Sequence, residues 1–307
     1  MEALSCPVCG ASKIRIAIPD TRDHILGDKF DILACDSCHI HYTHPMPTHM
    51  DRYYPVQYRG YGPLVLSILR LFYSQRIKRW IRLFDAPGTA LEIGCGSGIM
   101  LDLLRSNGWK VTGLERSDTA ASDGRSRLGL NIITGEITKI KEEKVFDLIF
   151  LFNALEHLND PKSMLQECQK RLKTNGLLII SVPNIESWQS RFGKGLWAHL
   201  DPPRHLFHFS RHSLEKMLLQ MGMERKRISY VSIEHDPYGW VQSMLNKIPG
   251  LHHLFTRFVM GLEKFNMRVF CSIILGILLT IPAFCISAVS WPLGKGALME
   301  LTFQQKR

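Results

Sequence analysis

In the middle third of the chain, short apolar runs alternate with longer segments that have a helical spacing of apolar residues. The runs at 90–94 and 110–115 are typical of strands, and the unbroken run at 146–152 is typical of a strand buried on both faces. Segments 98–108 and 161–176 have apolar stripes and end at Asn-Gly, which is typical of a helix terminus. Strand and helix in alternation predict a doubly wound, parallel α/β sheet.

A basic segment precedes this alternation. It begins at Pro63, a residue favoured in the first turn of a helix, and continues with apolar residues to about Phe84. Its cations are Arg70, Arg76, Lys78, Arg79 and Arg82, with no acid among them. The helix predicted here could lie on anionic lipid, or pack on the catalytic domain with a solvated basic face.

A second unusual pattern lies near the C-terminus, where residues 269–294 contain no charge. The run is long enough to span a membrane, but Pro282 near its centre would break or kink a helix. A short strand predicted at 298–303 would join the same sheet as 227–234, which puts both ends of the run on one side of a membrane. We therefore expect a helical hairpin bent at Pro282 that dips into one leaflet. An apolar subdomain packed on protein or a dimer partner, and a full span with the last strand unpaired, are the alternatives.

These patterns divide the chain into successive parts. Residues 1–58 form an N-terminal module, and 59–88 a basic linker helix. Residues 89–236 and 297–307 form the catalytic α/β domain, and 237–296 an apolar membrane-associating insertion.

Composition narrows the possible partners and the compartment. The 307 residues include 38 Lys and Arg against 28 Asp and Glu, a formal charge of +10 that suits anionic partners such as phospholipid or nucleic acid. The first residues lack a basic n-region and an apolar h-region, so no signal peptide is predicted. The 8 cysteines are therefore expected in a reducing cytosol and not as a disulfide framework.

Half of those cysteines lie in two Cys-x-x-Cys pairs, Cys6 with Cys9 and Cys35 with Cys38. Two such pairs can close a tetrahedral four-thiolate zinc site, and the residues between them can supply a strand pair. Haem attachment through Cys35 and Cys38 would leave the first pair unexplained, while redox or free thiols remain an alternative. Because four thiolates leave no open coordination position, the predicted zinc ion is structural.

The first strand of the alternation ends in the glycine-rich sequence LEIGCGSG. Gly94, Gly96 and Gly98 allow the backbone to turn sharply and approach a ligand at a helix N-terminus. Glu92 beside the loop would repel a pyrophosphate but suit a cationic ligand. Glu115 ends the second strand, at the distance from the loop where an acid binds ribose hydroxyls.

With these features, the sequence resembles the class I S-adenosylmethionine-dependent methyltransferases. The resemblance extends over residues 89–184 and includes LEIGCGSG, GLE, FDLIFLFNALEHLNDP and RLKTNGLLIISVPN. It implies that Glu92, Gly94 and Gly96 line the methionine part of the cofactor and that Glu115 binds the ribose diol.

The same resemblance places two further residues beside the cofactor. Glu136 follows the third strand and Asn153 ends the fourth. Glu136 has a second interpretation as a solvated loop acid.

Histidines gather after the fifth strand, in the segment AHLDPPRHLFHFS. A hydroxyl acceptor would need a base to take its proton, and one helical turn would put His205 and His208 on the same face. These two are the candidate bases, although the histidines could instead only hold the loop. The stretch DPPRHLFHFS is similar to one in the ubiquinone-biosynthesis and polysaccharide-associated branch of these methyltransferases, in which zinc-ribbon-like N-terminal modules also occur.

Taken together, the sequence predicts a methyltransferase at the cytoplasmic face of a membrane. The expected acceptor is a hydroxyl of a lipid-linked saccharide, a glycolipid or a quinone-like molecule, and the oligomeric state stays open. A zinc-module RNA methyltransferase is an alternative, but NALEHLND lacks the Asn-Pro-Pro-aromatic loop that holds base nitrogens. A catalytically inactive membrane adaptor is the non-enzymatic alternative.

Overall fold

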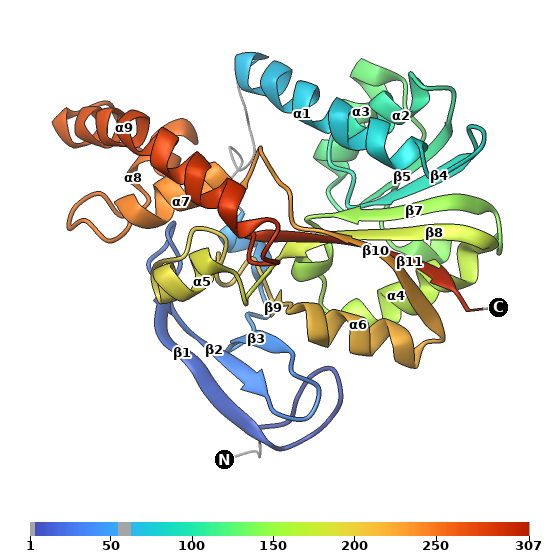
Figure 1. Cartoon of the computed structure of the whole chain (residues 1–307), viewed down its shortest axis with the longest axis horizontal. Coiled ribbons are helices and arrows are strands. Elements are labelled where there is room, and N and C mark those ends of the chain that lie inside the picture. The colour runs from blue at the N-terminus through green and yellow to red at the C-terminus, as the bar shows by residue number, and fades with distance from the viewer. Residues whose placement is uncertain (1–3, 55–62, 307) are drawn as a thin grey trace.

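The computed structural model describes residues 4–54 and 63–306. A sheet of seven strands forms the centre of the molecule, and a smaller sheet of four strands lies below it (Figure 1). Two apolar clusters cover the two faces of the large sheet. The predicted α/β class is therefore confirmed.

The large sheet has the strand order β10-β11-β8-β7-β4-β5-β6. The strands from β4 to β8 are parallel, and β11 lies antiparallel between β8 and β10. The final strand therefore does join the catalytic sheet. The strand bounds are β4 Thr89–Ile93, β5 Lys110–Glu115, β6 Ile132–Thr134, β7 Phe146–Phe152, β8 Leu172–Pro183, β10 Met223–Ser229 and β11 Leu298–Gln305.

Helices flank this sheet on both faces. The predicted helix at 161–176 ends at Arg171, because Leu172 already begins β8. Its start is fixed by Asp160, whose side chain accepts a hydrogen bond from the Ser163 amide. The flanking helices are α1 Pro63–Ile81, α2 Ile99–Arg105, α3 Asp118–Leu128, α4 Pro161–Arg171 and α6 Arg211–Gln220.

The basic helix α1 packs on the sheet along its C-terminal half. Ile77 and Trp80 are buried, and Arg76 is 2% exposed. Arg76 forms ion pairs with Glu234 and with Glu300 of β11. The C-terminal half of this helix therefore packs on the catalytic domain, as one of the two interpretations predicted. Arg76, however, is buried and is not part of a solvated basic face.

The N-terminal module is a small antiparallel sheet in the order β1-β2-β3-β9. Three of its strands come from the module itself, β1 Ile14–Arg22, β2 Lys29–Cys35 and β3 His41–His44. The fourth, β9 Phe207–His208, comes from the histidine-rich segment of the catalytic domain. The module is thus joined to the catalytic domain by strand pairing, and the boundary expected at residue 58 lies outside the described residues.

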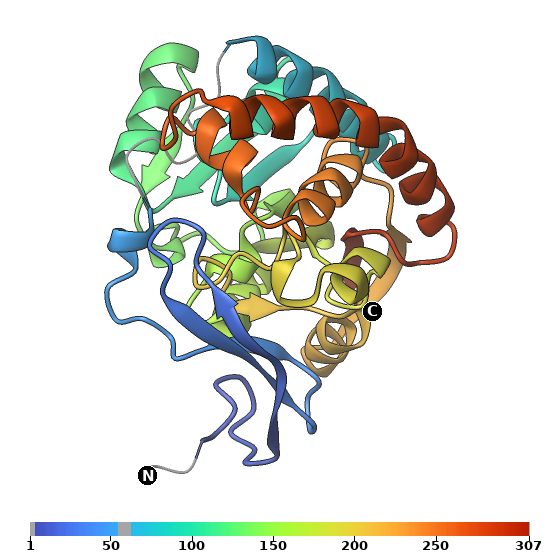
Figure 2. The same cartoon turned by 90° about the vertical axis from the view of Figure 1, so that its left-hand side faces the viewer.

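The insertion consists of three helices, α7 Asp236–Leu245, α8 Leu254–Val259 and α9 Met267–Ser290. The predicted hairpin is wrong, because Pro282 lies inside one continuous helix. α9 packs against α7 and α8. Figure 2 shows it crossing the upper part of the molecule and changing direction along its length. Within the described residues, α9 is the one helix that is long and apolar enough to cross a membrane by length and composition.

Short helices complete the connections. They are η1 Met50–Tyr53, η2 Ile137–Lys139, η3 Leu155–His157, α5 Trp188–Gly193 and η4 Lys194–Leu196. Of these, η3 directly follows the end of β7 and so lies at the carboxyl edge of the parallel strands.

Candidate active site and cysteine cluster

The glycine loop turns sharply between the end of β4 and the start of α2. Gly94, Gly96 and Gly98 all have positive φ, at 72°, 53° and 81°. A Cβ atom on Gly94 would lie 2.8 Å from the Ala154 Cβ, whereas a Cβ on Gly96 would meet no atom within 4 Å. Gly94 and Gly98 are therefore needed for packing, while Gly96 faces open space at the loop.

Two carboxylates flank this loop. Glu115, at the end of β5, accepts hydrogen bonds from the backbone amides of Gly96 and Ser117, both at 2.8 Å. Glu92 is buried, and its Oε2 has no hydrogen-bond partner among the described residues. Burial, reinforced by the nearby negative charge of Glu115, raises the pKa of Glu92 well above its usual value. A cation bound here would relieve both effects.

Asn153 directly follows the last residue of β7 and has a φ of 50°. This left-handed conformation costs energy in residues other than glycine. The Nδ2 atom of Asn153 lies 3.4 Å from Nε2 of His235, and its Oδ1 is buried with no hydrogen-bond partner in the described part of the chain. Glu136, in contrast, is exposed at the start of η2. The structure thus brings Glu92, Glu115 and Asn153 to one edge and leaves Glu136 on the surface.

His205 lies beside η3. Its Nδ1 is 2.9 Å from the carbonyl oxygen of His199, and its Nε2 is 4.0 Å from Oε1 of buried Glu156. Because a carbonyl only accepts, Nδ1 of His205 carries the proton in this contact. The ligand atoms of Glu156, His157 and His205 lie within 4.8 Å of one another.

His208 has a different environment. It is 2% exposed, belongs to β9, and its Nε2 lies 3.1 Å from Oγ1 of Thr43 in β3. Burial lowers its pKa well below the usual value. The expected helical turn is absent between His205 and His208, where the chain instead enters β9. His208 therefore joins the small sheet to the catalytic domain.

The chain matches a family model described as a methyltransferase domain over residues 65–225. This match covers half of the chain and includes Glu92, Glu115, Asn153, His205 and His208. The chain belongs to the class I S-adenosylmethionine-dependent methyltransferases.

Relatives of this methyltransferase include ubiquinone biosynthesis O-methyltransferases. The protein of that name from Bradyrhizobium diazoefficiens is 29% identical over 136 residues, covering 42% of this chain and 53% of the relative. The one from Glaesserella parasuis is 35% identical over 105 residues, covering 31% of this chain and 44% of the relative. The chain thus spans about half the length of the curated relatives it matches.

Solved structures show the same fold. A methyltransferase from Thermotoga maritima, described as a possible histamine N-methyltransferase, superposes with a TM-score of 0.51 at 19% identity, covering 79% of this chain and 92% of that one. A methyltransferase from Archaeoglobus fulgidus has a TM-score of 0.50 at 17% identity, covering 77% and 94%. At these identities the likeness concerns the fold alone.

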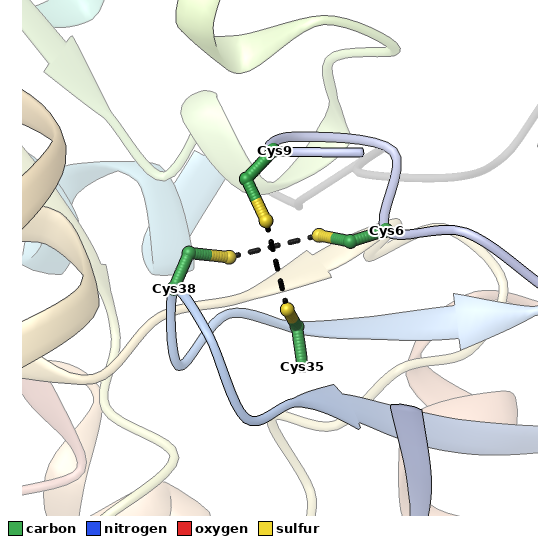
Figure 3. Close-up of side chains that lie close together, drawn as sticks. All are labelled: Cys6, Cys9, Cys35 and Cys38. Atoms are coloured by element: carbon green, nitrogen blue, oxygen red, sulfur yellow. Dashed lines mark hydrogen bonds between the residues drawn. The ribbon is translucent and has the colours of Figure 1, made fainter. Parts of the chain in front are cut away.

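The four module cysteines of the methyltransferase converge in space. Figure 3 shows their side chains pointing toward one common centre. The Sγ atoms of Cys6 and Cys38, and those of Cys9 and Cys35, are 3.6 Å apart, and all four lie within 4.8 Å of one another. Sulfur atoms about 2.3 Å from a tetrahedral zinc ion are about 3.8 Å apart, so this donor set fits zinc.

Sequence reasoning missed several residues that the structure places beside the candidate site. His235 reaches Asn153 from the start of the insertion, and Glu156 and His157 approach His205 from η3. The Glu-His pair is visible inside the motif NALEHLND, but nothing in the sequence links it to His205. No local signal identifies His235, because its position depends on how β10 leads into α7.

Proposed function

We propose that this methyltransferase transfers a methyl group from S-adenosylmethionine to a hydroxyl of a lipid-linked saccharide, glycolipid or quinone-like acceptor at the cytoplasmic face of a membrane. The observation that carries the cofactor assignment is the pair of carboxylates beside an open glycine loop. The names of the curated relatives support oxygen as the acceptor atom.

The cofactor-binding residues are at the ends of β4, β5 and β7. Glu115 keeps acceptor capacity for a ribose diol after its two backbone contacts, because a carboxylate can accept about four hydrogen bonds. The buried Glu92 Oε2 and Asn153 Oδ1, which have no hydrogen-bond partner among the described residues, would accept hydrogen bonds from the methionine end of the cofactor. Bound S-adenosylmethionine supplies an electrophilic methyl group on a sulfonium, and its two cationic groups match these acceptors.

His205 is the proposed base, and it is preferred over His208. With Nδ1 held by the His199 carbonyl, the Nε2 atom is the one that can take a proton from an acceptor hydroxyl. Glu156, 4.0 Å away, would stabilise the imidazolium that forms. His208 is tied to Thr43 in the joint between the two sheets, and this position leaves it a structural role.

The cysteine cluster is proposed to hold a structural zinc ion. Four thiolates satisfy its coordination, so it would stabilise the module and not act on the substrate. The module pairs with β9, close after His205 in the chain, and the metal would therefore help to position the segment that carries the base.

A transfer assay with methyl-labelled S-adenosylmethionine tests the proposal. The purified chain is mixed with membrane extract or with soluble extract, and label is followed into the organic and aqueous phases. We expect label in the organic phase, reduced about 100-fold or more by His205→Gln and unchanged by His49→Gln at an exposed histidine. Label only in RNA or in water-soluble molecules would contradict the lipid-borne acceptor.

The zinc assignment has its own test. Metal analysis should find one zinc ion per chain, and a chelator should lower the melting temperature together with loss of that zinc. Cys35→Ser should reproduce this loss, whereas Cys285→Ser, at an exposed cysteine of α9, should not. A chain that is metal-free and equally stable would refute the assignment.

A further inference from the structure

Helix α9 exposes many large apolar side chains, although Ile273, Leu275 and Leu279 are half-buried against the domain. Its buried positions are mostly small, Ser272, Ala283, Ser287 and Ser290, with Val269 as the exception. Ile281, by contrast, is 76% exposed. Small residues at the most deeply buried positions and large apolar ones outside are typical of helices that pack in lipid. The large apolar side chains that face outward on α9 and beside its ends are Phe265, Met267, Phe270, Ile274, Ile277, Leu278, Ile281, Phe284, Val289 and Leu293.

The polar groups of α9 are also satisfied in the way that lipid requires. Every hydroxyl side chain of the helix bonds to a carbonyl of the helix itself, at 2.7–2.8 Å, as Ser272, Thr280, Ser287 and Ser290 do. Thr280 is exposed, yet its hydroxyl bonds to the Gly276 carbonyl. A protein partner would normally find hydrogen-bonding groups on such a face, about one per 100–200 Å². A hydrocarbon environment needs none.

Cations lie at the ends of this apolar face. Lys264 and Arg268 are exposed at the N-terminal end of α9, and Lys295 follows its C-terminal end. Glu263 lies nearby, 3.8 Å from Arg257. With a formal charge of +10 on the whole chain, these cations match the anionic headgroups of a phospholipid surface.

α9 is held along its whole length by the soluble domain. Val269 packs with Leu251 and Leu254 near the start of the helix. At the middle, a Cβ on Gly276 would lie 3.5 Å from Val241 of α7. Just past the end, Trp291 Nε1 donates to Asp236 at 2.6 Å. A helix attached at both ends and the middle cannot cross a bilayer without the domain, but it can lie flat on one.

We infer that α9 is an in-plane membrane helix, whose outer face enters one leaflet of a bilayer containing anionic phospholipid. The inference rests on the proposed function only where it concerns the acceptor. Helix α7 packs against α9 and begins next to His235, which contacts Asn153. A membrane on the outer face of α9 would therefore be one helix away from the candidate active site. Figures 1 and 2 place α9 in the upper part of the molecule and the cysteine module in the lower part.

Vesicle flotation of the full chain tests this surface. We expect binding to phosphatidylcholine vesicles that contain about 30% phosphatidylglycerol, and weaker binding without it or at high salt. Ile277→Glu with Ile281→Glu should lower binding roughly 100-fold or more, because two large side chains lose their burial in hydrocarbon. Ile16→Glu is the matched control, since Ile16 is 59% exposed on β1 of the module, and it should leave binding unchanged.

Two exposed cysteines of α9 distinguish a flat helix from a spanning one. Cys271 and Cys285 are roughly four turns apart, so they share a face and are separated by about 21 Å along the axis. A fluorophore on either cysteine, with the other changed to Ser, should be quenched by lipid-attached quenchers at the same shallow depth. A variant lacking both cysteines corrects for labelling elsewhere in the chain.

Two outcomes would overturn the inference, and a third would refute only the proposed function. Clearly different depths for the two probes would indicate a spanning helix. A concentration-dependent dimer that does not bind vesicles, and that Ile281→Glu dissociates, would assign the face to a second copy. Retained vesicle binding without methyl transfer would refute the proposed function but not the membrane-binding surface. The two results can be distinguished because vesicle binding and S-adenosylmethionine binding are measured separately for each variant.

Discussion

At the carboxyl edge of the large sheet, acceptor atoms of Glu92 and Asn153 are buried without hydrogen-bond partners among the described residues, whereas along α9 large apolar side chains face outward. Both arrangements cost free energy in a protein surrounded only by water. A polar, cationic ligand would relieve the first, and a hydrocarbon surface would relieve the second. The comparison shows how a region indicates its partner: unpaired buried acceptors favour a cationic ligand, and exposed apolar side chains favour an apolar surface.

The largest effect that separates the two regions is expected at Gly96. Gly96→Arg should weaken S-adenosylmethionine binding by more than about 100-fold, because the side chain would enter the open space beside Glu115 at a positive φ. Isothermal titration calorimetry measures this change, and vesicle binding should be unaffected.

The matched control for that variant is Gly129→Arg. Gly129 also has a positive φ, 61°, and a Cβ added there would meet no atom within 4 Å, but it ends α3 away from the loop. It shares the backbone strain of the Gly96 variant and should retain cofactor affinity. Equal loss in both variants would mean that strain, and not occupation of the cofactor space, causes the defect.

The buried and exposed faces of α9 can be compared by introducing leucine at two nearby positions, one on each face. Ser287→Leu should lower the free energy of unfolding by about 1–3 kcal/mol, because Ser287 is fully buried against the domain. Val289→Leu introduces the same residue where the side chain is 54% exposed and should change stability little. Denaturant unfolding compares the two variants, and a larger loss of stability in Val289→Leu would contradict this assignment of the buried and exposed faces.

Glu92→Gln should separate stability from binding at the cofactor edge. The pKa of Glu92 is higher in the folded chain than in the unfolded chain. The free energy of unfolding therefore falls as the pH rises above the pKa of the unfolded chain, because Glu92 must ionise in a buried site. Glu92→Gln has no such ionisation and should flatten this pH dependence. The same change should weaken S-adenosylmethionine binding about tenfold, or about 1.4 kcal/mol, by removing a charge that faces a cation. A variant that is less stable and binds equally well would show that Glu92 is structural.

The last expected effect is an acid-dependent loss of stability at His199. Burial lowers the pKa of His199 to about 3. As the pH decreases from about 6.5, this side chain takes up a proton in the unfolded chain but not in the folded chain, so the free energy of unfolding falls. His199→Gln should reduce this slope by up to about 1.4 kcal/mol per pH unit. Thermal unfolding between pH 4 and 7 gives the slopes, which the exposed His49→Gln should leave unchanged.

Local patterns predicted the parts of the fold that depend on neighbours in sequence. The strand ends at Glu92, Glu115 and Asn153 and the two Cys-x-x-Cys pairs were identified from the sequence, because spacing and chain direction are enough to place them at one edge or one knuckle. His235 and Arg76 were not assigned to their positions. Both depend on contacts between segments far apart in the chain, from α1 to β11 and from β7 to α7.

The sequence by itself determined that residues 269–294 would be uncharged and apolar, that a final strand would follow them, and that glycines and carboxylates would meet at a cofactor edge. Only the tertiary structure decided that Met267–Ser290 is one continuous helix, with Ser272 and Ser287 buried and Ile281 exposed. Composition records how apolar a segment is, but the direction of each side chain depends on which neighbour the helix packs against. For α9 the main neighbour is α7, and ten large apolar side chains on α9 and beside its ends stay exposed although Ile273, Leu275 and Leu279 pack against the domain.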